Sequence, residues 1–418
     1  MSPSQDLRRW ATFVSLSLLF FLVNAGTFAS LGVVLHAMVP EMGWTWSQAG
    51  LGYTVLGQSC GFACLLPPLL IRRVGVRSPL MIGTVLLVVG FSLLARGHSV
   101  ATYLTATLMM GAGNALTATV PGTHVLTSLF RRRSAVLGAY FTAGALGAVV
   151  GPLLYVAVNS LTHGWRVYWV LFACGAAVFG LFAVLATPNR LDASTPETVD
   201  RLDATQLVEG LRQWTVRRAL GAPQFYVIAG SYMLYLMINT TMHGFTVEHL
   251  SEHGIDPKAA AAMMSFEALV GAGISTAGGF LGEKVGAKRL LIAALVALGV
   301  GATALSEARG FGLMTVYALA QGTAFGLIYV APAVLLLTYF GRGPYLELYS
   351  LMSLFSVLAA VGPTIAGRAR DIFGDFSGVF QLFAAATLLM LAAAVTMKPP
   401  GGPAQPEPQA KSLAREAA

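Results

Sequence analysis

Few polar side chains interrupt the long apolar runs of this sequence, and Glu267 is the most informative of them. It stands in the run MMSFEALVGAG, nine residues into a predicted apolar helix. A carboxylate at membrane depth costs about 3 kcal/mol or more, and a low dielectric favours its protonated form. We therefore predict that Glu267 takes up a proton on one side and releases it on the other, or contacts a solute. The alternative is a carboxyl group near the interface or paired with another helix.

His124 is the second candidate for proton transfer. It follows Pro121 by three residues in another apolar run, and imidazole titrates near neutral pH. The alternative is a packing histidine held by a hydrogen bond. His243 lies near the predicted outer end of its helix and is a further candidate for proton transfer, again because imidazole titrates near neutral pH.

Uncharged polar side chains within the apolar runs are candidates to hydrogen-bond a solute. Each of them alone is more often structural than functional. Tyr329 precedes Pro332 by three residues, and Asn24 and Tyr235 hold equivalent places in the internal repeat described below. The predicted solute-binding candidates are Asn24, Asn114, Tyr140, Tyr232, Tyr235, Asn239, Gln321, Tyr329 and Ser353.

The composition indicates that these residues belong to a membrane protein. Hydrophobic residues make up 56% of the 418 and charged residues only 11%, whereas a soluble chain carries roughly 25% charged residues. Apolar segments of about 20 residues recur, each long enough to cross a hydrocarbon core of about 30 Å. The sequence predicts an all-α membrane protein with twelve transmembrane helices, at residues 11–37, 47–71, 79–96, 101–129, 134–158, 165–187, 223–247, 258–282, 289–307, 311–339, 345–367 and 374–396.

Lysine and arginine predict the direction in which the helices cross. The segments on the side of the two termini hold 20 of the 26 basic residues, and the opposite loops hold 6. By the positive-inside rule both termini are cytoplasmic, which defines an inner and an outer end for each helix. We expect an integral protein of a bacterial inner (plasma) membrane, with its basic residues against anionic lipid. No nucleic-acid partner is expected, because no soluble basic domain is predicted.

Enzymatic and metal chemistry are not expected. The sequence offers no nucleophile–base pair, metal cluster or phosphate-binding loop. Cys60, Cys64 and Cys174 fall inside apolar segments, where cysteine usually serves as a small packing residue. We predict no metal and no cofactor, and a monomeric protein.

An internal repeat with an offset of 211 residues organises the chain. The stretch from Gly111 to Pro152 recurs from Gly322 to Pro363, with Pro121 matching Pro332. Other pairs with this offset are Glu41 with Glu252, Gly43 with Gly254 and Gly75 with Gly286. A constant offset over this length is typical of a parallel duplication in a transporter. We therefore predict two pseudo-symmetric bundles of six helices.

The repeat also predicts the domain organisation. We expect a first six-helix bundle at residues 1–187, a cytoplasmic linker at 188–222 and a second bundle at 223–398. The second half of the linker is amphipathic, which favours a short helix on the inner membrane surface over a plain solvated linker. The tail at 399–418 is rich in proline, glycine and charge and is expected to be disordered.

Twelve spans in two parallel halves with a long central loop resemble the major facilitator superfamily. The stretch GFLGEKVGAK is similar to the loop motif of that superfamily, in which glycines, an acid and bases latch the inner ends of neighbouring helices. The resemblance implies a conformational latch at Gly279, Glu283, Lys284, Gly286 and Lys288. The first copy departs from the motif, since Arg72 replaces the acid and Pro68 the glycine.

Within the superfamily, the sequence resembles the monocarboxylate transporter and oxalate/formate antiporter group. The stretches that carry this resemblance are MGWTWSQ at 42–48, LFRRR at 129–133, GWR at 164–166 and GPTIAGRARDIFG at 362–374. The resemblance implies a secondary active transporter that moves a small organic solute, such as a monocarboxylate, by alternating access and with protons. The site is then expected between the halves, near the middle of the membrane.

Two departures leave other functions open. The group usually has an arginine eight residues before the acid of the loop motif, and here Ser275 stands there, so a neutral solute is a competing prediction. The pattern of glycines from Gly138 to Pro152 also resembles a motif of proton-antiport drug exporters, although Tyr155 and Val156 replace its closing glycines. A third alternative is a sensor or receptor with the same fold that does not transport.

Overall fold

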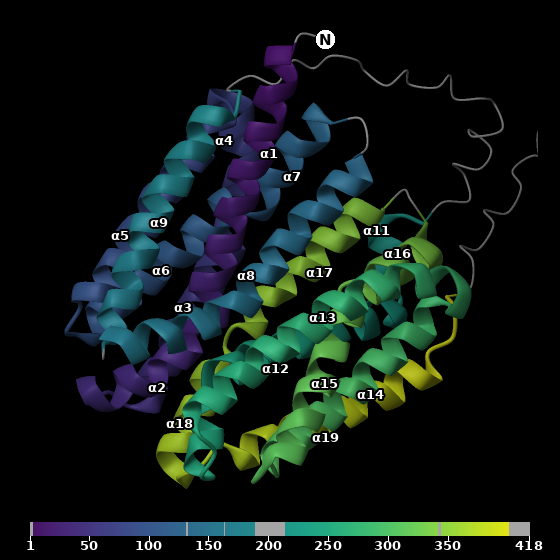
Figure 1. Cartoon of the computed structure of the whole chain (residues 1–418). Coiled ribbons are helices and arrows are strands. Elements are labelled where there is room, and N and C mark those ends of the chain that lie inside the picture. Colours follow the sequence, from purple (N-terminus) through teal and green to yellow (C-terminus); the bar gives the residue numbers. More distant parts are fainter. Residues whose placement is uncertain (1–2, 131–132, 163, 189–213, 342–343, 401–418) are drawn as a thin grey trace, which may run out of the picture.

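The protein is a bundle of helices in two halves. The computed structural model describes residues 3–130, 133–162, 164–188, 214–341 and 344–400, and all regular elements within them are helical. Figure 1 shows one bundle built from the helices of the first half of the chain and a second built from those of the other half. The prediction of an all-α fold with two like bundles is confirmed.

The helices of the first half follow its six predicted spans, several of which are broken. The break in the first span is a single π-helical turn, and the second span bends by 42° between its two helices. In chain order the elements are α1 (Pro3–Asn24), η1 (Ala25–Ala29), α2 (Ser30–Met42), α3 (Trp46–Ala63), α4 (Leu66–Val74), α5 (Arg77–Arg96), α6 (Val100–Thr117), α7 (Thr119–Leu129), α8 (Arg133–Thr162) and α9 (Trp165–Ala186).

The second half repeats this order after a short helix. Its elements are α11 (Val216–Leu220), α12 (Pro223–Glu252), α13 (Pro257–Val285), α14 (Ala287–Ser306), α15 (Phe311–Ile328), α16 (Ala331–Phe340), α17 (Tyr345–Ala359), α18 (Gly362–Phe373) and α19 (Ser377–Thr396). Residues 189–213 and 401–418 lie outside the described residues, and with them most of the predicted linker and tail. The predicted domain boundaries therefore stay predictions.

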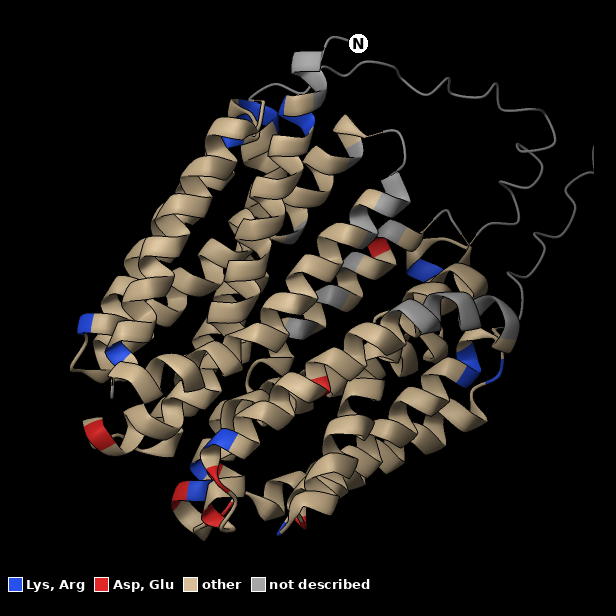
Figure 2. Cartoon of the chain, viewed as in Figure 1, with Lys and Arg blue, Asp and Glu red and all other residues tan. Residues whose placement is uncertain are grey.

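Length and composition support a membrane location for these helices. Among the described residues, seven helical segments are long and apolar enough to cross a membrane, or eight if the bent pair α3 and α4 is one span. Each of the twelve predicted spans coincides with a helix or with helices separated by a short break, so a count of twelve fits. Figure 2 shows the charged residues almost entirely at the two ends of the bundles, with long uncharged ribbon between.

The 211-residue offset reappears in the backbone. Gly43 and Gly254 have φ values of 65° and 82°, and Gly75 and Gly286 have values of 103° and 89°. Residues other than glycine rarely adopt such positive φ values. Each pair therefore places the same turn at the same point of its half, which explains why glycine stands at both positions.

The helix breaks repeat with the same offset. In the first half Ala118 separates α6 from α7, and in the second half Tyr329 follows the last residue of α15. Each break precedes a proline by three residues, Pro121 and Pro332. Proline lacks the N–H that a continuous helix would use, so it favours a break in the turn before it.

A basic residue holds the end of the last helix in each half. Arg77 donates from Nε to the carbonyl oxygen of Thr187 at 2.8 Å. Its counterpart Lys288 donates from Nζ to the carbonyl oxygens of Val395 and Met397, at 2.8 and 2.6 Å. A cation suits this place because the final carbonyls of a helix have no partner within the helix.

The two halves meet chiefly along α2 with α12, α3 with α18 and α8 with α13. We name the end where α1 begins and α19 ends the inner end, and the opposite end the outer end, following the predicted sidedness. Helices α4, α7 and α16, at the inner end, pack chiefly within their own halves. In Figure 1 the two bundles spread apart toward this end.

Candidate functional site

A buried carboxyl group links three helices of the second half. Glu267 in α13 is only 2% exposed, and its Oε2 accepts a hydrogen bond from the hydroxyl of Tyr317 in α15 at 2.7 Å. The Tyr317 oxygen lies 3.3 Å from the hydroxyl oxygen of Thr246 in α12. Since Tyr317 donates its proton to Glu267, it accepts from Thr246. His243, one turn before Thr246, is close enough to interact electrostatically with Glu267.

A pair of amides lies on the same two helices. Nε2 of Gln321, one turn after Tyr317 in α15, donates to Oδ1 of Asn239 in α12 at 3.3 Å. Oε1 of Gln321 is buried and has no hydrogen-bond partner among the described residues, and the same holds for the hydroxyl of Tyr235, one turn before Asn239. Buried polar groups normally have partners, so these two atoms are exceptions within the described interior.

Aromatic rings gather at the break between α15 and α16. The ring of Tyr329 is met edge-on by Tyr232, Tyr235 and Phe325, with centroid distances of 6.0, 6.1 and 5.3 Å. Tyr329 itself is 42% exposed. The structure therefore brings four of the predicted solute contacts of the second half, Tyr232, Tyr235, Asn239 and Tyr329, onto α12 and the break that faces it.

The predicted contacts of the first half surround its π-helical turn. Asn24 immediately precedes η1 and donates from Nδ2 to the carbonyl oxygen of Phe20 at 3.0 Å. Nδ2 of Asn114 in α6 lies 3.3 Å from Oγ1 of Thr27, which belongs to η1. A π turn inside an α-helix is frequently found at functional sites, and here polar side chains of two helices meet at it.

Three other candidates lie apart from these groups. Tyr140 is fully buried and donates to the carbonyl oxygen of Ala118, the residue at the α6–α7 break, at 2.8 Å. His124 is exposed on α7. Ser353 lies in α17, and its side chain is outside the described residues.

The predicted latch is described only in part. Gly279, Glu283 and Lys284 belong to the last turns of α13, and their side chains lie outside the described residues. Gly286 forms the turn after that helix, with positive φ. Lys288 contacts the end of α19. The latch itself stays a prediction.

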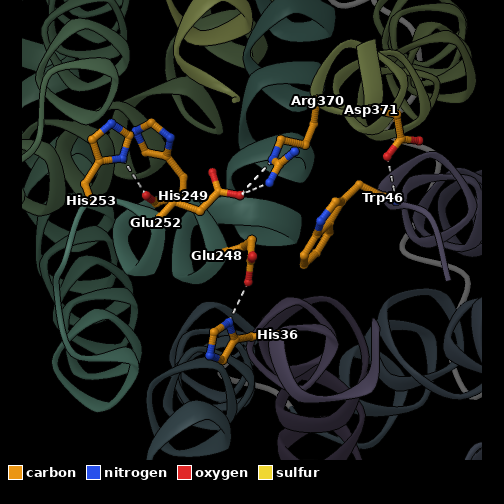
Figure 3. A network of polar contacts seen from close by, with 8 residues as sticks. All are labelled: His36, Trp46, Glu248, His249, Glu252, His253, Arg370 and Asp371. Atoms are coloured by element: carbon orange, nitrogen blue, oxygen red, sulfur yellow. Dashed lines mark hydrogen bonds and ion pairs between the residues drawn. The ribbon is translucent and has the colours of Figure 1, made fainter. Parts of the chain in front are cut away.

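At the outer end, side chains close the contact between the halves (Figure 3). Asp371 in α18 accepts hydrogen bonds from the backbone N–H groups of Trp46 and Ser47 at the start of α3, at 3.0 and 2.9 Å. Nδ1 of His36 in α2 lies 2.5 Å from Oε2 of Glu248 in α12. These contacts were not predicted from the sequence.

Deeper contacts continue this closure. The hydroxyl of Thr54 in α3 donates to the carbonyl oxygen of Ala360 at 2.6 Å. A Cβ atom on Gly32 would lie 1.8 Å from the carbonyl oxygen of His243, and one on Gly50 would lie 2.1 Å from that of Pro363. Glycine at these positions lets the backbones of the two halves touch. Because these contacts lie toward the outer end, the structure is closed there.

Positive charge is confined to the ends of the bundle. Among the residues whose side chains are described, no Lys or Arg lies near the middle of a span (Figure 2). At the outer end Arg166 pairs with Glu41, and Arg370 with Glu252. The described residues also hold no group of three or more His, Cys, Asp or Glu side chains that could bind a metal ion. The middle of the protein therefore offers hydroxyl, amide, imidazole and carboxyl groups.

Comparison with known proteins agrees with this architecture. The sequence profile of the Major Facilitator Superfamily matches residues 16–251 and 228–417, so the chain belongs to this superfamily of membrane transporters. It is therefore an integral membrane protein that carries a small-molecule solute, and not an enzyme.

One relative supports a narrower similarity. The chain is 26% identical to monocarboxylate transporter 13 of Rattus norvegicus over 316 residues, which cover 74% of this chain and 70% of the relative. The predicted resemblance to the monocarboxylate transporter group is confirmed as a similarity of sequence.

Solved structures share the fold. A mutant of the nucleoside transporter NupG has a TM-score of 0.75 and 14% identity, covering 92% of this chain and 99% of its own. A bacterial homologue of the human lysosomal transporter Spinster, in an inward-facing and unoccupied conformation, has a TM-score of 0.74 and 15% identity, covering 94% and 96%. At these identities the similarity concerns the fold alone.

Proposed function

We propose that the chain is a proton-coupled secondary transporter that moves a small organic acid, in the first place a monocarboxylate, by alternating access. The observation that carries the proposal is the burial of Glu267, 2% exposed in the middle of an apolar bundle. An ionised carboxylate is costly there, so its charge state depends on which side the site faces. Such a group couples proton binding to a change of conformation.

Tyr317 and Thr246 set the conditions under which Glu267 gives up its proton. When the carboxyl is ionised, it accepts the hydrogen bond of the Tyr317 hydroxyl, which Thr246 supports from α12. A hydrogen bond to the charged form stabilises that form. A rearrangement of α12 against α13 and α15 would weaken this support and favour the protonated form. The three helices thus tie proton binding to helix position.

The solute is proposed to bind beside this group, between the halves. Tyr235 and Gln321 each keep a buried polar atom without a partner among the described residues, and Asn239, one turn after Tyr235 in α12, accepts a hydrogen bond from Gln321. Tyr232, Tyr329 and Ser353 of the second half and Asn24, Asn114 and Tyr140 of the first half complete the proposed contacts. His124 is the alternative proton carrier. A carboxylate that crosses together with a proton carries no net charge, so its site does not require a cation.

Alternating access would use the contacts between the halves. The outer closure at Asp371, His36 and Glu248 would open as an inner closure forms. The latch residues Gly279, Glu283, Lys284, Gly286 and Lys288 are proposed to act at the inner end. The proposal includes cytoplasmic termini, a bacterial inner-membrane location and a monomer.

A second candidate is an exporter of neutral or drug-like compounds that exchanges them for protons. The observation that favours it is the confinement of described Lys and Arg side chains to the ends of the bundle (Figure 2). A site dedicated to an anion normally contains a cation. Both candidates use Glu267, and they differ in the solute and its direction.

Uptake by the purified protein in proteoliposomes tests the proposal. The pH gradient is imposed in either direction, with a panel of monocarboxylates, dicarboxylates, neutral solutes and cationic dyes. We expect accumulation of a monocarboxylate on the side to which protons flow. Accumulation of neutral solutes or dyes against the proton flow would favour the exporter. No gradient-driven movement of any solute would contradict proton coupling.

A further inference from the structure

Two carboxylates of the second half hold the outer closure, and their partners differ in whether they can titrate near neutral pH. Asp371 binds the backbone N–H groups of Trp46 and Ser47, which do not titrate. Glu248 binds the imidazole of His36 at 2.5 Å. Histidine changes charge between about pH 5 and pH 8. Only the second contact therefore changes its charge with pH near neutrality.

The His36–Glu248 pair is accessible to protons. The side chain of His36 is 30% exposed and that of Glu248 is 15% exposed. The pair joins α2 to α12, one of the three helix pairs along which the halves chiefly meet, and Figure 3 shows it crossing between them. A change in its strength therefore acts directly on the closure.

The other charged or titratable groups around α2 interact with Glu41 or pair within the second half, and one of them is His98, in the loop between α5 and α6, which lies near Glu41. Helix α9 contributes Arg166, which pairs with Glu41 of α2 itself. Helix α12 contributes Glu252, which pairs with Arg370 of α18. Helix α3 carries no charged residue, and α8 carries none after its first residue. Among the described residues, the acid that faces the His36 ring is Glu248.

The remaining histidines of α12 contact backbone atoms. Nδ1 of His243 lies 3.0 Å from the carbonyl oxygen of Asn239, Nε2 of His249 lies 2.9 Å from that of Leu305, and Nδ1 of His253 lies 2.8 Å from that of His249. All three contacts stay within the second half. Their titration would not change a bond between the halves.

We propose that His36 and Glu248 form a proton-binding site in the outer closure, through which acid on the outer side favours the outer-closed state. The inference rests on the proposed transport function and on the predicted sidedness. A protonated imidazole forms a charge-assisted bond with the carboxylate, roughly twice as strong as a neutral one. The contact is made only when the outer end is closed. Protons therefore favour closure, and the closure weakens as the outer pH rises.

The site is separate from the proposed coupling acid. Glu267 binds its proton among Tyr317 and Thr246 inside the second half, whereas His36 belongs to the first half. Protonation of Glu267 concerns the solute cycle, and protonation of His36 concerns the direction that the empty protein faces. The two effects can be measured independently.

Distances between spin labels test the proposal on the full-length protein in lipid nanodiscs. Labels are placed at Arg96→Cys and Arg309→Cys, two exposed positions on the outer ends of different halves, after replacement of Cys60, Cys64 and Cys174 by serine. The distance distribution is recorded from about pH 8 to about pH 5.5, across the titration of histidine. We expect the ratio of outer-closed to outer-open protein to rise several-fold on acidification.

Three variants separate the contributions. All three are made in a Glu267→Gln background, which removes the protonation of the proposed coupling acid from the response. In that background His36→Gln and Glu248→Gln, tested separately so that one misfolded variant does not decide the result, should each remove the remaining pH response. Asp371→Asn should lower the closed fraction at every pH and keep the response. A response that persists in a folded His36→Gln or Glu248→Gln protein, or its absence from the parent protein, would overturn the inference.

Transport measurements distinguish this failure from failure of the proposed function. Proton-driven uptake combined with a response that His36→Gln leaves intact would refute the outer site alone. A response lost in His36→Gln, in a protein that moves no solute under a pH gradient, would refute proton-coupled transport and support the outer site. When only one face of the proteoliposome membrane is acidified, the outer-closed fraction should rise only if that face bears the loop at residue 256.

Discussion

The carboxylate of Asp371 lies at the start of α3, where it accepts a hydrogen bond from the backbone N–H of Trp46 at 3.0 Å. The next N–H, of Ser47, reaches its other oxygen at 2.9 Å. Within α3, Thr45 and Gln48 form a capping box that uses the N–H of Gln48. Asp371 therefore supplies the acceptors that the first two helical N–H groups still need. The start of a helix in one half is therefore completed by a residue of the other half.

Replacement of Asp371 by asparagine should weaken the outer closure. The substitution removes a charge from a helix N-terminus and one of two acceptors, a loss of about 1 to 2 kcal/mol. The ratio of outer-closed to outer-open protein should fall by about 5- to 30-fold. Label distances across the outer end measure it. Asp256→Asn is the matched control, because the partner of its carboxylate among the described residues is the N–H of Lys258 within its own loop. Equal distances in Asp371→Asn and the parent protein would refute the role.

A methyl group at Gly32 or Gly50 should hold the outer end apart. The added carbon would meet the carbonyl oxygen of His243 or of Pro363, at 1.8 or 2.1 Å. Overpacking of this kind costs about 1 to 3 kcal/mol, and here only the closed state bears the cost. Gly32→Ala and Gly50→Ala should therefore populate the outer-open state. Gly273→Ala, whose Cβ meets nothing within 4 Å, should leave the distances unchanged.

The repeat made much of the fold predictable from the sequence. The offset of 211 residues matched Pro121 with Pro332 and Gly75 with Gly286, and the structure has breaks and positive-φ turns at these points. Glycine and proline impose local backbone geometry, so their spacing is visible in a single sequence. The π turn after Asn24 was not predicted, since no residue type requires it.

The candidate site was predictable only in part. Glu267 stood out because a carboxyl group in an apolar run is costly, whereas its partner Tyr317 resembled a core aromatic residue. One signal was present, since Tyr317 and Gln321 are four residues apart and share a helix face. The contact of His36 with Glu248 joins residues 212 positions apart, on different halves. Neither periodicity nor spacing encodes such a pair.

Removal of the Tyr317 hydroxyl should change the pH dependence of transport. That hydroxyl donates to Glu267 at 2.7 Å and thereby stabilises the ionised carboxyl group. Without it, proton release needs a higher pH, and the midpoint of the pH profile of Tyr317→Phe should move upward by about one unit. Tyr226→Phe, at an exposed tyrosine, is the control. A profile that does not move would separate Tyr317 from the proton site.

The basic residues that hold the last helix of each half should contribute to stability. Lys288→Met removes the donors to Val395 and Met397 and should cost about 1 kcal/mol. Arg77→Met should act similarly through Thr187. Thermal unfolding in detergent measures both. The neighbouring Arg289→Met changes the same charge at an exposed position, and an equal loss there would show that the contacts are not the cause.

Gradient-driven accumulation by Glu267→Gln tests proton coupling most directly. The variant keeps the shape of the buried side chain but binds no proton, and Glu347→Gln, at an exposed residue of α17, serves as its control. In proteoliposomes with a transmembrane pH gradient, we predict that Glu267→Gln loses accumulation of the solute and retains solute exchange, while Glu347→Gln keeps both. Accumulation by Glu267→Gln equal to that of the parent protein would contradict the account.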